Sequence, residues 1–119
     1  MRKPVKISLI NSALEEYEKL ESIASIQISQ GVKSSPEIQL LKSINQKFEF
    51  IRLNPSYGDK IQKRIYYKTI NVRNLWRVEL AGYWRMLYTI RTDKVEIMCF
   101  ILDILDHARY DKKFGYRKK

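Results

Sequence analysis

The sequence is poor in the residues that build disulfides, metal centres and covalent active sites. It contains one cysteine, Cys99, and one histidine, His107, and its acidic residues show no metal-ligand spacing. Cys99 lies in the apolar run VEIMCFILDIL, which is typical of a small core residue and not of a nucleophile. A glycine-rich phosphate loop and a serine in a nucleophile context are also missing. We therefore expect no disulfide, no metal and no small-molecule cofactor.

Long apolar runs are absent as well. No stretch approaches the roughly 20 apolar residues that a membrane helix needs. The N-terminal sequence MRKPVKISLINSALEEYEKL lacks the long apolar segment of a secretory signal. Together with the single cysteine, these absences lead us to expect a cytoplasmic protein that does not act on a membrane.

Positive charge is abundant and unevenly distributed. The 119 residues include 23 Lys+Arg against 13 Asp+Glu, which gives a formal net charge of +10. Residues 56–119 hold 15 of the basic residues and 7 of the acids, and six basic residues lie between Arg109 and the end. Such asymmetry favours binding to a polyanion or an acidic partner. The alternative is a solubilising surface rich in Lys and Glu.

Two helices are expected in the first half of the chain. The spacing of apolar residues predicts a helix over about 11–30, and residues 6–10 either form a short strand or lead directly into it. Ser35 suits the N-cap and Pro36 the first position of a second helix, which ends at Asn54 before a proline. Because the connection is short, we expect the two helices to be antiparallel.

The pattern then changes to that of strands. The segments KRIYYKTI (63–70), LWRVEL (75–80), WRMLYTI (84–90) and VEIMCFILDIL (95–105) each fit a strand, and the last is apolar on both faces and therefore central. We predict a single α+β domain. It comprises an N-terminal antiparallel helical hairpin (11–54) packed on a three- to four-stranded antiparallel sheet (63–105), followed by a basic C-terminal tail (106–119).

Arg85 is unexpected within an apolar strand, because a buried and unpaired charge is strongly destabilising. The length of the preceding hairpin loop decides which face of the sheet it occupies. A two-residue loop would place Arg85 beside Val78 in the core, whereas the three-residue loop 81–83 pairs it with Glu79. We expect the three-residue loop. It puts Arg77, Glu79 and Arg85 on one open face, opposite Trp76, Val78, Met86 and Tyr88. Taken alone, such a cluster is typical of a surface ion pair.

The segments NLWRVEL and GYWRMLYTI, followed by an apolar strand that ends in DILDHARYDKKFGY, resemble the RelE/ParE toxin superfamily. In that family a helical hairpin precedes a strand–hairpin–strand of the type YRxRL…GYRxxY, and a last strand and a basic tail follow. The resemblance covers nearly the whole chain and is strongest over residues 74–116. Within the superfamily, DHARYDKKFGY looks closest to archaeal members whose target is unassigned.

The resemblance implies a small α+β toxin that is neutralised by a partner antitoxin. RelE-like members cleave mRNA on the ribosome without a metal, whereas ParE-like members inhibit DNA gyrase. We expect a RelE-like toxin of a type II toxin–antitoxin system, an endoribonuclease whose partners are its antitoxin, the ribosome and mRNA. The alternative is a non-enzymatic ParE-like inhibitor, or a basic module that binds nucleic acid or protein with a degenerate site.

Carried over by position, the resemblance assigns Arg85 to the scissile phosphate and Arg77 to the same active face. His107 and Tyr110 fall where such enzymes place catalytic groups just after the last strand. Glu79 stands where some members have lysine and others glutamate, so the general base is either His107 or Glu79. Tyr110 is also a candidate for stacking on a splayed base.

Two of these residues have alternative interpretations. His107 can instead be a polar residue at a strand end that pairs with Asp103 or Asp106. The C-terminal aromatic residues can pack back on the core, which we expect for Phe114. The wider set of residues expected to contact RNA is basic and comprises Lys63, Arg64, Arg109, Lys112, Lys113 and Arg117.

Overall fold

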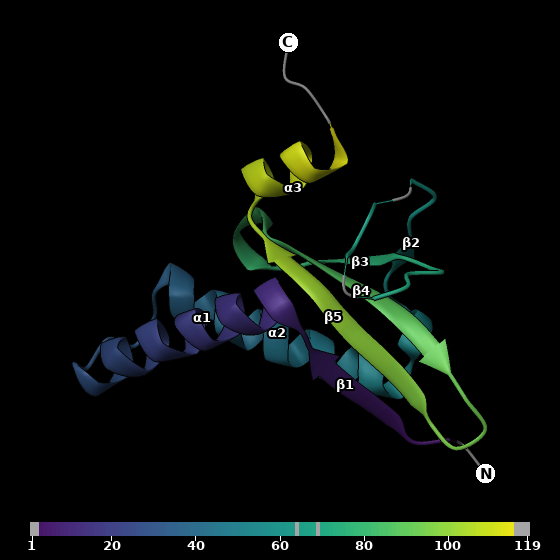
Figure 1. Cartoon of the computed structure of the whole chain (residues 1–119). Helices are drawn as coiled ribbons and strands as arrows, with labels where there is room; N and C mark the ends of the chain where they lie inside the picture. The colour runs from purple at the N-terminus through teal and green to yellow at the C-terminus, as the bar shows by residue number, and fades with distance from the viewer. Residues whose placement is uncertain (1–2, 64, 69, 116–119) are drawn as a thin grey trace.

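The sheet has five strands in the described part of the chain and is mixed rather than purely antiparallel (Figure 1). The computed structural model describes residues 3–63, 65–68 and 70–115. Strand β1 (Val5–Leu9) pairs in parallel with β5 (Ile97–Leu105), so an edge strand precedes the first helix. The other strands pair antiparallel in the order β5-β4-β3-β2, with β4 at Arg85–Thr92, β3 at Trp76–Glu79 and β2 at Asp59–Lys60. The predicted fold class, α+β, is confirmed. The prediction of a three- to four-stranded, purely antiparallel sheet was wrong.

Helices α1 (Asn11–Ser29) and α2 (Pro36–Leu53) lie together on one face of this sheet (Figure 1). The Ser35 side chain accepts a hydrogen bond from the Ile38 N–H at 3.0 Å, so the predicted start of the second helix is confirmed. Farther along, the Tyr17 hydroxyl donates to Asn45 at 2.7 Å and ties the two helices together. No helix among the described residues is both long and apolar enough to span a membrane.

The larger core cluster fills the space between these helices and the sheet. Its helical members include Ala13, Leu20, Ile44, Phe48 and Ile51, all of them buried. The sheet contributes Val78, Met86, Tyr88, Cys99, Ile101 and Ile104. Strand β5 lies between β1 and β4 and is buried on both faces, which confirms its predicted central position.

Residues 61–75 form no strand where the structure describes them and instead cross the opposite face of the sheet. The apolar residues of this segment pack against the second core cluster and are Ile61, Ile65, Tyr67, Ile70 and Val72. The predicted strand at 63–70 is therefore wrong. Its alternating apolar residues anchor a loop, because the outer edge of β3 is already paired with the two residues of β2.

The predicted C-terminal tail is also wrong, since residues 107–114 form a third helix, α3 (His107–Phe114). The Asp106 carboxylate accepts a hydrogen bond from the Arg109 N–H at 2.8 Å, and Gly115 ends the helix with a left-handed φ of 72°. Phe114 is 1% exposed and packs on the core, as expected. Because α3 and the segment 61–75 cover much of the second face, the open face predicted for the sheet is largely closed.

A buried carboxylate holds these covering elements together. Asp103 in β5 is 5% exposed and accepts hydrogen bonds from the Ser12 and Tyr67 hydroxyls, each at 2.8 Å. It also pairs with the Lys113 ammonium at 3.1 Å. Burial and the neighbouring Asp103 charge raise the pKa of Tyr67, so its hydroxyl stays protonated as the donor. One side chain thus connects α1, the segment 61–75 and α3 to the sheet.

The thiol of Cys99 allows a test of the core. Burial raises its pKa from 9.0 to about 11. Because the pKa of the thiol is higher in the folded than in the unfolded chain, the folded chain keeps its full stability below pH 9. As the pH rises toward 11, the free energy of unfolding falls by about 2 kcal/mol. Urea unfolding at pH 8 and pH 10.5 should show a larger loss of stability for the wild type than for Cys99→Ala. Equal losses would contradict a buried thiol.

Candidate active site

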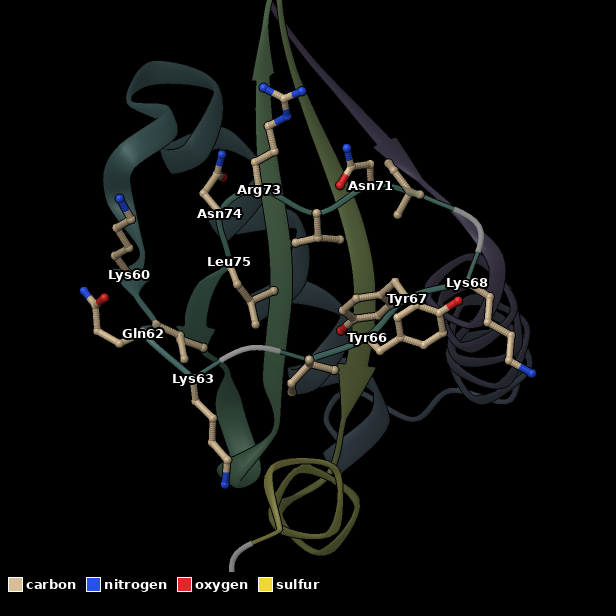
Figure 2. Close-up of a pocket in the computed structure, with 14 residues that line it drawn as sticks. Lys60, Gln62, Lys63, Tyr66, Tyr67, Lys68, Asn71, Arg73, Asn74 and Leu75 are labelled. Carbon is tan, nitrogen blue, oxygen red and sulfur yellow. The ribbon is translucent and has the colours of Figure 1, made fainter.

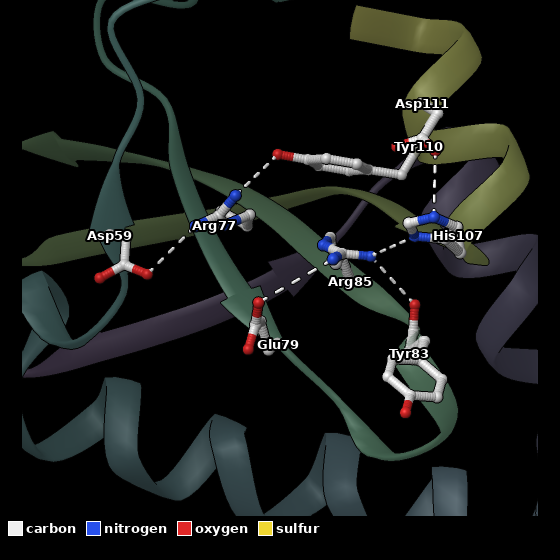
Figure 3. Close-up of polar contacts among 8 residues, drawn as sticks. All are labelled: Asp59, Arg77, Glu79, Tyr83, Arg85, His107, Tyr110 and Asp111. Carbon is white, nitrogen blue, oxygen red and sulfur yellow. Dashed lines mark hydrogen bonds and ion pairs between the residues drawn. The ribbon is translucent and has the colours of Figure 1, made fainter. Parts of the chain in front are cut away.

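The three-residue loop between β3 and β4 fixes the orientation of the predicted arginines. Residues 81–83 form the turn, and Glu79 pairs with Arg85 across the two strands. The register predicted from the loop length is therefore confirmed, including Val78 opposite Met86. As Figure 3 shows, Arg77, Glu79 and Arg85 lie on one side of the sheet, beneath the first turns of α3.

Arg85 is held mainly by neutral groups. Its side chain is 16% exposed, and its guanidinium lies 4.8 Å from the centre of the Tyr110 ring. Nη1 donates to the Tyr83 carbonyl at 3.2 Å and to His107 Nδ1 at 3.1 Å. The Glu79 carboxylate is 3.9 Å from Nη2 and 69% exposed, so it neutralises the charge only weakly. Nε of Arg85 is buried and has no hydrogen-bond partner among the described residues.

Arg77 has a similar environment on the neighbouring strand. It donates to the Tyr110 hydroxyl at 3.2 Å and to the Asp59 carboxylate at 3.5 Å. The hydrogen bond to Tyr110 raises the pKa of Arg77, with a smaller contribution from Asp59. Its buried Nε likewise lacks a partner within the described chain. Two guanidinium groups therefore converge on one tyrosine, and each retains an unused N–H donor.

Tyr110 connects these two cations and is not available to a base. It is 3% exposed, and its ring contacts the Arg85 guanidinium and the Phe114 ring, whose centre is 4.5 Å away. The hypothesis that Tyr110 stacks on a splayed base is therefore wrong.

The exposed aromatic residue next to Arg85 is Tyr83, which is 81% exposed. Tyr83 adopts a left-handed φ of 64°, a strained conformation for a residue with a side chain.

His107 is oriented from both sides of its ring. An arginine can only donate, so the Nδ1 atom that faces Arg85 accepts the hydrogen bond and carries no proton. The proton of the neutral ring is then on Nε2, which lies 3.1 Å from the Asp111 carboxylate. The partners of His107 are therefore Arg85 and Asp111, and the pairing with Asp103 or Asp106 was wrong.

Asp111 and Asp59 are site residues that the sequence analysis missed. Asp111 is four residues after His107, a spacing that places both on one side of a helix, but residues 106–119 were expected to form a tail. Asp59 reaches Arg77 only because Gly58 lets β2 approach β3. A Cβ on Gly58 would lie 2.7 Å from the Arg77 carbonyl oxygen.

Three of the six basic residues predicted to contact RNA have other partners. Arg109 pairs with Glu16 and Asp106 and stacks on Trp84. Lys113 pairs with Asp103, Lys63 bonds to the Phe114 carbonyl, and Lys112 is exposed. Arg64 and Arg117 lie outside the described residues. No group of three or more His, Cys, Asp or Glu side chains suited to a metal ion occurs in the described chain.

The site thus combines two arginines, a histidine backed by a carboxylate, and a tyrosine hydroxyl. Planar guanidinium groups match the oxygens of phosphates and carboxylates, and the weak pairing of Arg85 with Glu79 leaves capacity for an anion. The histidine supplies a proton acceptor within reach of the same anion.

The assignment of the His107 proton can be tested by ¹⁵N NMR. At pH 8 the imidazole should be protonated on Nε2 in the wild type and in Asp111→Ala, because Arg85 still donates to Nδ1, whereas the double variant Arg85→Ala/Asp111→Ala should give a mixture of tautomers. Glu79→Gln is a suitable control, since Glu79 contacts Arg85 and not the imidazole. A proton on Nδ1 in the wild type would contradict the geometry.

Two solved structures have a similar fold. The first is a YoeB/ParE toxin from Agrobacterium tumefaciens, with a TM-score of 0.55 and 12% sequence identity, covering 86% of this chain and 98% of that one. The second is a YoeB dimer from Staphylococcus aureus, with a TM-score of 0.51 and 15% identity, covering 87% of this chain and 98% of that one. No family model and no curated protein matches the chain. At these identities the likeness concerns the fold, and two bacterial neighbours give the archaeal resemblance no support.

Proposed function

We propose that the chain is the toxin of a type II toxin–antitoxin system and a RelE-like endoribonuclease that cleaves mRNA on the ribosome. The observation that carries the proposal is the Arg85 guanidinium, which is largely buried and only weakly neutralised, beside Arg77 and His107. The similar fold of the two toxin structures supports it. In this proposal the partners are a cognate antitoxin, the ribosome and mRNA.

The arginines hold the phosphate in the proposed reaction. The Nη groups of Arg85 and Arg77 donate to its non-bridging oxygens and stabilise the charge that develops on the phosphorane. Both cations are already fixed by Tyr110, so little side-chain entropy is lost when RNA binds. The phosphate competes with His107 and Glu79 for Arg85.

His107 takes the proton of the attacking 2′-hydroxyl. Once the phosphate replaces His107 as the acceptor for Arg85 Nη1, Nδ1 of His107 becomes available as a general base, and Asp111 stabilises the imidazolium that forms. The 2′-oxygen forms a bond to phosphorus as the bond to the 5′-oxygen breaks, and the leaving oxygen takes up a proton. The products are a 2′,3′-cyclic phosphate and a 5′-hydroxyl. Glu79, which is 69% exposed, is the alternative base.

A second function is favoured by a different observation. Both ring nitrogens of His107 and the hydroxyl of Tyr110 have protein partners, an arrangement that also suits a rigid binding surface without chemistry. The corresponding function is non-enzymatic inhibition of DNA gyrase, as in ParE-like toxins, or binding of nucleic acid or protein by a degenerate site.

Replacing Arg85 separates these functions. Arg85→Ala should lower single-turnover cleavage of ribosome-bound mRNA by about 10²-fold or more, because one preorganised donor to the transition state is lost. In vitro translation with primer extension measures the cleavage. Arg91→Ala is the matched control. Arg91 is exposed near the other end of β4, so this variant should cleave mRNA at the wild-type rate.

Two results would refute the endoribonuclease proposal. In the first, the wild type leaves mRNA intact and inhibits DNA supercoiling by gyrase, which would favour the ParE-like function. In the second, cleavage is undetectable and Arg85→Ala unfolds the protein. Arg85 would then be a structural residue whose partners all lie within its own chain.

A further inference from the structure

The segment 60–75 encloses a groove on the face of the sheet that also carries α3. The groove has a volume of about 1070 Å³, and every residue that lines it comes from this segment. Figure 2 shows the segment passing in front of β4 and β5. This groove has no part in the chemistry proposed for Arg77, Arg85 and His107.

Burial divides the segment into two sets of residues. The apolar set, with Ile61, Ile65 and Ile70, packs on the second core cluster and holds the segment in place. The exposed set carries cations, amides and one aromatic ring: Gln62, Lys63, Tyr66, Lys68, Asn71 and Arg73. Residues 60–75 include five Lys+Arg and no Asp or Glu. Four of these cations and no acid are among the described residues that line the groove, which is therefore positively charged.

Packing against the core does not explain the position of the Tyr66 side chain. That side chain is 81% exposed, although the neighbouring Tyr67 is anchored by the Asp103 carboxylate and covered by Lys113. An exposed tyrosine among lysines suits stacking on an unpaired base, while the cations contact the backbone phosphates. An acidic peptide would satisfy the cations but would make little use of the flat ring or of the amides of Gln62 and Asn71.

We propose that the 60–75 groove is a binding site for single-stranded RNA. Tyr66 stacks on a base, Lys68 and Arg73 contact phosphates, and Gln62 and Asn71 hydrogen-bond to base edges or 2′-hydroxyls. Lys63 bonds to the Phe114 carbonyl at the end of α3, the helix that carries His107 and Tyr110. The groove therefore adjoins the C-terminal end of the helix that carries the candidate site residues. Its role as a path for the substrate rests on the proposed endoribonuclease function, whereas RNA binding in the groove does not.

Binding to an RNA that cannot be cleaved tests the groove by itself. The probe is a short, fluorescein-labelled 2′-O-methyl RNA without secondary structure, followed by fluorescence anisotropy. Tyr66→Ala should weaken its binding by about fivefold to 100-fold through loss of one stacked base. Lys68→Gln should reduce the slope of log K against log salt by about 0.7, which corresponds to one phosphate contact on a single strand. Tyr57→Ala and Lys42→Gln are controls outside the groove and should bind as the wild type does.

Several outcomes would overturn the proposal. One is unchanged affinity in Tyr66→Ala and Lys68→Gln while the folded state is retained, since both side chains are exposed. Another is equal affinity for the matching RNA duplex, because a paired base cannot stack on Tyr66. Full competition by polyglutamate at equal charge would assign the groove to an acidic protein instead.

The groove proposal and the proposed function can be refuted independently. If the wild type does not cleave mRNA but its RNA binding depends on Tyr66, the proposed function fails and the groove proposal stands. If Arg85→Ala abolishes cleavage while Tyr66→Ala changes neither RNA affinity nor the KM for cleavage, the groove proposal fails and the proposed function stands.

Discussion

The buried carboxylate of Asp103 is the interaction on which both proposed sites depend. It accepts hydrogen bonds from Ser12 and Tyr67 and pairs with Lys113, so it joins α1, the segment 60–75 and α3 to the central strand. Loss of the carboxylate would leave these buried groups without partners, a defect that typically costs about 1–3 kcal/mol for each group. The groove around Tyr66 and the position of His107 both follow from elements that this side chain holds in place.

Arg85 shows how a fold can retain a cation without fully neutralising it. The ring of Tyr110, the carbonyl of Tyr83 and the imidazole of His107 surround the guanidinium with electron-rich but uncharged groups. A close carboxylate would stabilise the folded chain more and would also compete more strongly with an incoming phosphate. The distant and exposed Glu79 leaves most of that capacity to a ligand.

The sequence allowed the hairpin to be predicted because a slip of one residue would have moved Arg85 into the core beside Val78. Ser35 and Pro36 likewise marked the start of α2. The segment 63–70 was misjudged because Ile65 and Tyr67 alternate with polar residues in a loop anchored on a core as they would in a strand. Helix α3 has only eight residues and many charges, so its pattern was weak. Without that helix, the relation of Asp111 to His107 could not be seen, nor could the burial of Tyr110.

The parallel pairing of β1 with β5 has a consequence for the order of folding. Val5 pairs with Ile97, so β1 is synthesised well before the strand with which it pairs. Contacts so distant in sequence form late, because a long loop must close before they stabilise anything. Helices α1 and α2 can associate while the chain is still being synthesised, whereas β5 and α3 are made later. A nascent chain therefore carries Arg77 and Arg85 before it has the α3 residues that orient them.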